Sequence, residues 1–499
     1  MEDSLKKRYL IKLIANILNG LINIVIVAIV PKALGPISFG QFSYIQQFFT
    51  QFINFLDSGT STAFFIKLSK DIKRKELLKF YFLYALSVLI ITYLIIFSID
   101  NLNYITILFP NIEIEFIYLG ILFGFLVWFT RVFIYISDAY VLTVWVESFK
   151  IVHKILSLLL LIYFIYYLPF DLTQYFYFNY ISLSLFIIAI SFLFIKKGII
   201  SFDIFTTQLN SIFLIKEFFN FASPLVIFNM VAISFSMFDI WLLQKLGGSE
   251  QTGFYGLAYS ISAMCFLFTS AMTPIITREF AKSFAEKNIK EMRVLFFKYI
   301  PIFYAIATYF SVFIAFQSEN LLVIFTNHEF HDAYLVLMIM AYYPIHQTYG
   351  QLSGSIFYVT EQTKLIRNIG IISSILGFIL TILFLYIFDL RAIGLAFKMV
   401  IIQIISVNIQ LYFNSKFLDF KISYFIKHQI FSLLFFMLIA YITDFIVFPF
   451  SNKLIEFLVS GLIYTVFVLI GVIIAPTIFG LSKEEILSIK NYLKKIRIK

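Results

Sequence analysis

Long apolar stretches separated by short polar segments run through the whole sequence. Each stretch is close to the roughly 20 apolar residues that cross a bilayer core about 30 Å thick. The run Leu83–Phe97 and the run Ile155–Leu168 do not alternate in polarity, as strands of a membrane barrel would. The pattern predicts an all-α polytopic membrane protein of about 14 transmembrane helices. We expect these helices near 11–30, 39–65, 80–99, 116–138, 152–168, 175–195, 218–243, 255–277, 298–316, 333–358, 367–387, 392–414, 429–448 and 455–475.

Composition agrees with the pattern. Of the 499 residues, 61% are hydrophobic and 13% are charged, and the mean hydropathy is +0.93. A soluble domain carries roughly 25% charged residues. Cys265 is the single cysteine, which excludes an internal disulfide and a site built from several cysteines. We therefore expect an integral membrane protein.

The positions of lysine and arginine predict the orientation. With the N-terminus in the cytoplasm, most of the 38 basic residues fall on the cytoplasmic side, including the clusters 67–79 and 278–298 and the tail 483–499. The predicted outer loops hold Lys32, Lys245, Arg391 and Lys453. This bias follows the positive-inside rule and places both termini in the cytoplasm. The net charge of +10 is then a topology signal and a match to anionic lipid, with no nucleic-acid partner.

A stretch rich in glycine and proline, Pro31–Tyr44, joins the first two predicted helices, and a looser copy lies at Lys245–Ile261. We align Leu34-Gly35 with Leu246-Gly247, and Phe39-Gly40 with Tyr255-Gly256. An even number of spans separates the copies, so both halves cross the membrane in the same direction. We predict two pseudo-symmetric six-helix lobes, residues 1–217 and 218–415. Residues 416–499 add two C-terminal helices and a basic cytoplasmic tail.

Four motifs point to a known family. They are Asn16-x-x-Asn19-Gly20, then Pro31-Lys-Ala-Leu-Gly35 followed by Gly40, then Asp57-x-Gly59, and a second-half segment from Ser223-Pro224 through Asp239 to Gly253-Phe-Tyr-Gly256. The chain resembles the Wzx-type polysaccharide biosynthesis flippases of the multidrug/oligosaccharidyl-lipid/polysaccharide exporter superfamily. The resemblance extends over essentially the whole chain. Lys32 is a departure, since an arginine is more frequent there.

The resemblance implies a MATE-like (MOP) fold of two lobes facing each other as a V. It implies translocation of undecaprenyl-pyrophosphate-linked oligosaccharide repeat units from the cytoplasmic to the outer leaflet, for O-antigen or capsule synthesis. It also implies alternating access, coupling to an ion gradient in many members, a location in the inner (plasma) membrane and no cofactor. Whether the chain works alone or beside a polysaccharide polymerase and a chain-length regulator stays open.

A flippase needs a hydrated groove, because a sugar and pyrophosphate headgroup cannot enter hydrocarbon without losing its hydrogen bonds. Arg131 and Lys398 lie inside predicted helices. A cation near the bilayer centre costs roughly 2.5–3.5 kcal/mol on insertion scales, which favours a cavity-facing position. We expect both residues to bind the pyrophosphate. The alternatives are snorkelling to the membrane surface or pairing with a carboxylate.

Amide side chains form stripes on the first two predicted helices. Asn16, Asn19 and Asn23 share one face of the first helix, because residues three and four apart are neighbours on a helix. Gln47, Gln51 and Asn54 lie on one stripe of the second. We expect these six residues to line the headgroup path. Hydrogen bonds between helices are the alternative.

Asp57 and Asp239 are carboxylates in or beside predicted helices. Both are candidates for binding a coupling cation or proton, and pairing with Arg131 is a further possibility. Asp57 lies near the cytoplasmic end of its helix, where a capping role competes with a role in transport.

A drug antiporter, a membrane enzyme and a metal site are weighed against translocation. A cation-coupled drug antiporter of the same fold would prefer carboxylates to Arg131 and Lys398 inside the membrane. A membrane polymerase or acyltransferase is opposed by the short outer loops. The segment 328–332 contains two histidines and two carboxylates but lacks metalloprotease spacing, so no metal site is expected. We therefore expect a transporter and no enzyme.

Overall fold

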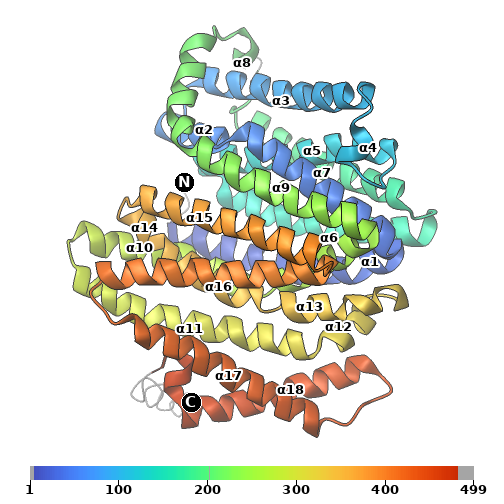
Figure 1. The fold of residues 1–499 in the computed structure, drawn as a ribbon. Helices are drawn as coiled ribbons and strands as arrows, with labels where there is room; N and C mark the ends of the chain where they lie inside the picture. Colours follow the sequence, from blue (N-terminus) through green and yellow to red (C-terminus); the bar gives the residue numbers. More distant parts are fainter. Residues whose placement is uncertain (1–4, 202, 482–499) are drawn as a thin grey trace, which may run out of the picture. The chain divides into compact units, whose positions relative to one another are not determined.

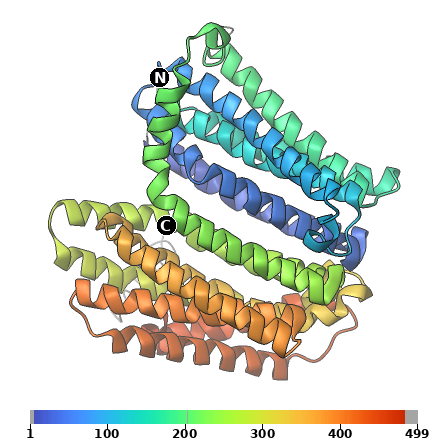
Figure 2. The same cartoon turned by 45° about the horizontal axis from the view of Figure 1, so that its top comes forward.

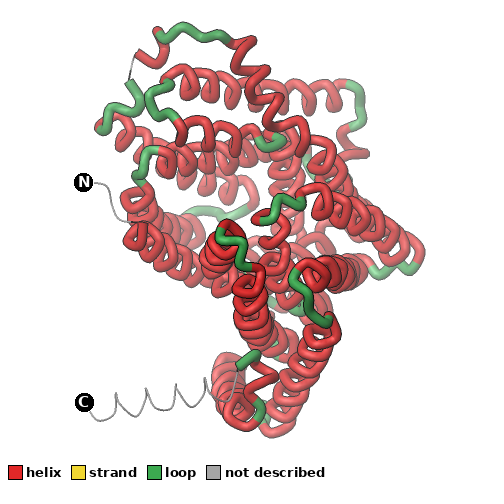
Figure 3. The backbone as a smooth tube through the Cα atoms, turned by 90° about the vertical axis from the view of Figure 1, so that its left-hand side faces the viewer, coloured by secondary structure: helices red, strands yellow, loops and turns green. Residues whose placement is uncertain are grey.

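The computed structural model describes residues 5–201 and 203–481, and within these residues all regular structure is helical (Figures 1 and 3). The prediction of an all-α fold is confirmed. Backbone contacts divide the chain into two compact units, Met1–Gly253 and Phe254–Lys499. The lobes 1–217 and 218–415 are inferred from the repeated hairpin in the sequence, and they stay a prediction.

The first unit contains the first eight helices and most of the ninth. Their bounds are α1 Leu5–Asp57, α2 Thr60–Lys70, α3 Lys75–Asn101, α4 Ile105–Leu108, α5 Ile114–Ala139, α6 Thr143–Tyr167, α7 Leu172–Lys196, α8 Asp203–Thr206 and α9 Ser211–Ala263.

Helix α5 is central to the first unit, because α1, α2, α3, α6 and α7 all pack against it. Large aromatic side chains fill the space between these helices. Phe64 stacks on Tyr81 with ring centroids 4.1 Å apart, and Trp128 and Phe133 of α5 are buried in the same cluster. Van der Waals packing of this kind holds helices together in a bilayer, where burial from water adds little between them.

The outward face of α3 is apolar instead of polar. Leu83, Leu86, Ile90 and Leu94 are all about half exposed, and their spacing places them on one side of the helix. A row of this kind is unfavourable in water and suits contact with lipid tails. The distribution of exposed side chains therefore agrees with a membrane location.

The second unit contains the rest of the chain, and its long helices are coloured yellow to red in Figure 2. The bounds are α10 Phe266–Ala285, α11 Ile289–Phe316, α12 Ser318–Phe325, the 3₁₀ helix η1 His328–Ala333, α13 Tyr334–Met340, α14 Tyr343–Val359, α15 Thr363–Thr381, the π-helix η2 Ile382–Ile387, α16 Arg391–Phe417, α17 Ile422–Ile446, α18 Lys453–Ile474 and the 3₁₀ helix η3 Pro476–Phe479.

Helix α11 organises the second unit. It packs against α10, α14 and α17, while α16 packs against α14 and α15. Tyr304 of α11 and Tyr349 of α14 are fully buried in its core. The last two long helices, α17 and α18, pack on each other, and Tyr464 of α18 stacks on Tyr309 of α11 with centroids 5.2 Å apart. Helix α17 also packs on α11, and α18 packs on α12, so the two C-terminal helices are part of the second unit.

Eleven helices of the described chain have the length and hydropathy to cross a membrane. Two of these helices each consist of two helical segments joined at a kink. Both α1 and α9 contain a glycine with non-helical torsions, Gly35 (φ 72°, ψ 169°) and Gly248 (φ 70°, ψ −174°). The predicted tenth span falls on α13 and α14, which are broken apart at residues 341–342. With two double helices and one broken helix, the eleven helices are consistent with about 14 spans.

The repeat is present, but its predicted register is wrong in the hairpin. The counterpart of the kinked Gly35 is Gly248, since both have φ near 70°, and not Gly247. The same offset pairs Gly40 with Gly253 instead of Gly256.

Candidate functional site

Arg131 and Asn54, two of the predicted substrate-binding residues, lie together in the first unit. Arg131 Nη1 donates to Asn54 Oδ1 at 3.4 Å, joining α5 to the second half of α1. The arginine lies about 12 Å from the end of α5 at Ala139, at a rise of 1.5 Å per residue. Its side chain is exposed. Among the described residues, the hydrogen-bond partner of this guanidinium is the Asn54 amide and not a carboxylate.

The other amide residues lie along α1 on both sides of the Gly35 kink. Asn19, Gln47 and Gln51 are half-buried, and Asn23 is exposed. The side chain of Asn16 lies outside the described residues. In the described part of the chain, the amides of Asn19, Asn23, Gln47 and Gln51 form no side-chain hydrogen bond. The alternative of hydrogen bonding between helices therefore gains no support at these four positions.

Lys398 is in the second unit, on α16, and is 9% exposed. It lies against α15 at Gly377. A Cβ at Gly377 would be 3.0 Å from Lys398 Cε and 3.6 Å from Nζ. The missing side chain makes room for the lysine stem. The structure thus buries Lys398 between helices of its own unit.

Asp57 connects α1, α2 and α3 through its Oδ1 atom. This oxygen accepts hydrogen bonds from Thr60 Oγ1 (2.8 Å), Ser61 N (3.0 Å), Ser61 Oγ (2.6 Å) and Tyr81 Oη (3.1 Å). Gly59 follows with φ 89°, which lets the chain turn from α1 into α2. This is the geometry of a capping carboxylate. Asp239, the other predicted carboxylate, is buried in α9.

A charged stretch at the start of α6 was not predicted. The fifth span was expected near residues 152–168, whereas α6 begins at Thr143. Glu147 is 1% exposed, and its Oε1 accepts a hydrogen bond from Lys150 Nζ at 2.8 Å. Among the described residues, Glu147 Oε2 has no hydrogen-bond partner. The apolar run 144–146 ahead of Glu147 was the signal that the helix starts earlier.

Lys154 is a further missed residue. It lies about 16 Å into α6 from Thr143, at a depth similar to that of Arg131 in the neighbouring helix. In the part of the chain that the structure describes, its ammonium forms no hydrogen bond or ion pair. Arg131 and Lys154 both lie within helices of the first unit that are long and apolar enough to cross a membrane. A cation inside such a helix is a functional-site candidate.

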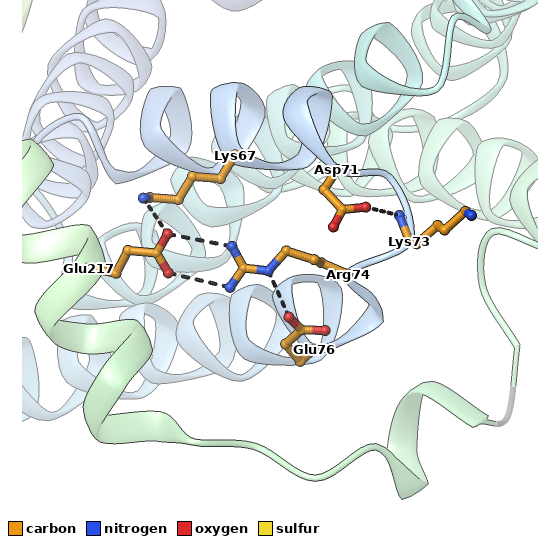
Figure 4. Close-up of polar contacts among 6 residues, drawn as sticks. All are labelled: Lys67, Asp71, Lys73, Arg74, Glu76 and Glu217. Atoms are coloured by element: carbon orange, nitrogen blue, oxygen red, sulfur yellow. Dashed lines mark hydrogen bonds and ion pairs between the residues drawn. The ribbon is translucent and has the colours of Figure 1, made fainter.

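A charge cluster connects α2, α3 and α9 on the predicted cytoplasmic side (Figure 4). Glu217 of α9 accepts from Lys67 Nζ at 2.7 Å and from Arg74 Nη2 at 3.4 Å, and Arg74 Nε donates to Glu76 at 2.7 Å. Partial burial acts to raise the pKa of Glu217, but the bonds from Lys67 and Arg74 outweigh it and leave the pKa below its usual 4.5. Burial likewise acts to lower the pKa of Arg74, but its bonds to Glu76 and Glu217 outweigh burial and raise the pKa above its usual value. The cluster attaches the start of α9 to the α2–α3 turn.

Buried polar groups also surround Tyr304 in the second unit. The rings of His346, Tyr349 and His428 lie 5.6 to 5.9 Å from the Tyr304 ring. Beyond them, the Asn408 and Gln429 amides join α16 to α17 at 3.2 Å. These residues fix three helices around α11.

No group of three metal-ligating side chains occurs among the described residues. His331 Nδ1 and Asp332 Oδ1 are 3.7 Å apart in η1, and both side chains are well exposed. These two side chains are therefore solvated at the surface of a short 3₁₀ helix.

Comparisons with known proteins were made for sequence and fold. The model of the family described as polysaccharide biosynthesis protein matches residues 5–278, more than half of the chain. A second family model, MatE, matches residues 224–383. No curated protein matches the chain.

Solved structures share the fold. A lipid II flippase, MurJ, in an inward closed conformation has a TM-score of 0.68 at 16% identity, covering 93% of this chain and 98% of that one. A MATE family multidrug resistance transporter of the MOP superfamily, in an inward-facing conformation, has a TM-score of 0.58 at 16% identity, covering 84% and 95%. An outward-facing MATE structure gives 0.56 at 16% identity, with 83% and 95% covered. At these identities the likeness shows the fold. The family match shows that this chain belongs to the family described as polysaccharide biosynthesis protein.

Proposed function

We propose that the protein translocates an undecaprenyl-pyrophosphate-linked oligosaccharide from the cytoplasmic to the outer leaflet, for surface polysaccharide such as O-antigen or capsule. The observation that carries the proposal is Arg131, an exposed guanidinium at membrane depth whose observed partner is the neutral amide of Asn54. A guanidinium binds phosphate oxygens through two parallel hydrogen bonds. The Asn54 contact orients the group, and a neutral amide does not compensate its charge.

Lys154 supports the same binding mode from the next helix. A pyrophosphate carries more than one negative charge, so a second cation at similar depth adds to its attraction. Lys398 is the corresponding candidate in the second unit.

The sugar part of the headgroup needs neutral hydrogen-bond partners. The amides of Asn19, Asn23, Gln47 and Gln51 can each donate and accept, and they form no side-chain hydrogen bond among the described residues. Asn16 and Asn54 belong to the same two predicted stripes of amide residues. We assign these amides to the path of the sugar hydroxyls.

The proposed cycle is alternating access, probed in solved relatives by inward-facing and outward-facing MATE structures. Asp57 and Asp239 are the candidate carboxylates for a coupling ion, and the inner membrane with both termini in the cytoplasm is the proposed setting. The lipid bilayer and the lipid-linked oligosaccharide are the proposed partners. A polysaccharide polymerase and a chain-length regulator would act after translocation.

A second candidate is a cation-coupled antiporter of small molecules or drugs. The MatE model match over residues 224–383 favours it. The membrane-depth cations Arg131 and Lys154 oppose it, because a cationic drug would be repelled by them.

Deletion of the gene in its host separates the two candidates. Translocation predicts that lipid-linked oligosaccharide accumulates in the cytoplasmic leaflet and that surface polysaccharide is lost. Wild-type protein expressed from a plasmid should reverse both changes. Unchanged surface polysaccharide together with raised drug sensitivity would favour the antiporter and contradict the proposal.

A further inference from the structure

A groove of about 440 Å³ lies in the first unit between α9, α1 and the segment that follows α3. Phe48 of α1, Ile107 and Leu108 of α4, and Met237 and Trp241 of α9 line it, so its walls are almost wholly apolar. The Trp241 indole Nε1 donates to the Ile107 carbonyl at 2.8 Å. This bond holds the ring as a fixed wall, with its polar edge satisfied.

A lysine stands at one end of this wall. Lys245 follows Trp241 by one turn of α9, is exposed, and places Nζ 4.8 Å from the centre of the indole ring. The orientation predicted from the basic residues puts Lys245 on the outer side of the membrane. The positive charge of Lys245 therefore lies beside the indole ring that forms one wall of the groove.

The repeat supplies a comparison within the same chain. In the register set by Gly35 and Gly248, Lys32 corresponds to Lys245, and Ala28 corresponds to Trp241. Lys32 is also exposed. The first hairpin therefore has the lysine without the aromatic wall. The aromatic wall beside the lysine is therefore specific to the second copy of the hairpin.

We propose that this groove binds the isoprenoid tail of the carrier lipid after translocation, with its phosphate on Lys245. A polar ligand would lose hydration in the groove without gaining partners, whereas a hydrocarbon chain would replace lipid contacts on the apolar walls. The phosphate needs a cation at the surface end, and Lys245 provides it. The proposal rests on the proposed function, and it adds an exit site for the lipid on α9.

Trp241 is a built-in reporter of this site. The chain has three tryptophans, so the double variant Trp128→Phe and Trp145→Phe leaves Trp241 as the single emitter. We would place this full-length variant in phosphatidylcholine nanodiscs and titrate undecaprenyl phosphate. The expected result is a saturable change in emission. Lys245→Met should weaken the apparent affinity at least tenfold, and Lys32→Met, the repeat-equivalent control, should leave it within twofold.

A second variant tests the groove apart from the lysine. Ser234 lines the groove and is exposed, so Ser234→Phe should fill it and abolish the response while thermal unfolding stays unchanged. An equal response to phosphatidylglycerol would mean that any anionic lipid binds, and a response to inorganic phosphate would mean an anion site without a tail. Either result, or no saturable change at all, overturns the proposal.

The two proposals fail in different ways. Specific binding of undecaprenyl phosphate with no accumulation of lipid-linked oligosaccharide in the deletion strain would overturn the function and keep the site. Accumulation without a Trp241 response would keep the function and overturn the site.

Discussion

Gly40 of α1 and Gly253 of α9 meet backbone to backbone. A Cβ on Gly40 would lie 1.7 Å from the Ser249 carbonyl oxygen and 2.8 Å from the Gly253 nitrogen. In return, a Cβ on Gly253 would lie 2.3 Å from the Pro36 carbonyl oxygen and 3.3 Å from the Gly40 nitrogen. The two hairpin copies therefore exchange equivalent contacts, Gly40 for Gly253 and Pro36 for Ser249. A side chain at either glycine requires α1 and α9 to move apart.

Substitution of Gly40 by alanine should therefore destabilise the protein. The added methyl group meets backbone atoms, which cannot rotate away, and overpacking of this kind costs about 1–3 kcal/mol. A lower thermal midpoint in detergent, measured by tryptophan fluorescence, is the expected result for Gly40→Ala and for Gly253→Ala. In Gly354→Ala, the control, the methyl group would meet the Gln410 side-chain oxygen at 3.3 Å and no backbone atom. Equal midpoints for all three variants would contradict the close contact.

The hairpin also shows how far sequence patterns reach. Its glycines and its repetition were visible, but Gly247 and Gly248 are adjacent, and short dipeptide matches cannot tell which one takes a positive φ. The start of α6 was misjudged because Glu147 and Lys150 look like a polar boundary. In the structure they neutralise each other inside the helix. The amide stripes and Arg131 could be predicted because each depends only on the residue pattern within a single helix. The contact of Arg131 with Asn54 joins residues far apart in the chain and depends on how α1 packs on α5.

Arg131 gives the most direct test of the proposed headgroup site. Arg131→Ala should reduce surface polysaccharide at least tenfold at unchanged protein level, because the guanidinium is lost. Arg131→Lys should keep the charge without the two-pronged geometry and show an intermediate level. Asn54→Ala should have a smaller effect, since it removes the group that orients the arginine. Surface polysaccharide per cell, normalised to membrane protein level, is the measurement.

Arg391→Ala is a matched control, because this exposed arginine pairs locally with Asp389 at 3.4 Å and lies outside the proposed path. Full export by Arg131→Ala would remove Arg131 from the site.

The Glu217 cluster predicts an acid-dependent loss of stability. The folded-state pKa of Glu217 is depressed below its usual 4.5 by Lys67 and Arg74, against the effect of burial. Its stabilisation is therefore present above about pH 4.5 and is lost as pH falls through the folded-state pKa. Glu217→Gln should lower the unfolding free energy by about 1 kcal/mol at pH 7, as for a partly exposed ion pair. The difference from wild type should shrink below pH 4.5.

Thermal midpoints from pH 3.5 to 7 would measure this dependence. Glu250→Gln is the control, since Glu250 is exposed and makes no ion pair among the described residues. Added salt should reduce the Glu217 effect by screening. A Glu217→Gln difference that stays constant down to pH 3.5 would show that the carboxylate is not held by Lys67 and Arg74.

Asp57 can be tested for its two roles with a pair of variants. Asp57→Ala leaves the Thr60, Ser61 and Tyr81 hydroxyls without their common acceptor, so it should lower the unfolding free energy by about 1–3 kcal/mol. Asp57→Asn keeps an acceptor oxygen in the same place and should cost less than about 1 kcal/mol. Because four donors already occupy Oδ1, we expect the folded Asp57→Asn protein to keep the ion dependence of transport. Ion-gradient-driven export in vesicles measures it, with Asp239→Asn in parallel. Loss of ion dependence in a normally stable Asp57→Asn protein would instead assign the coupling ion to Asp57, since charge would then matter more than hydrogen bonding at this junction.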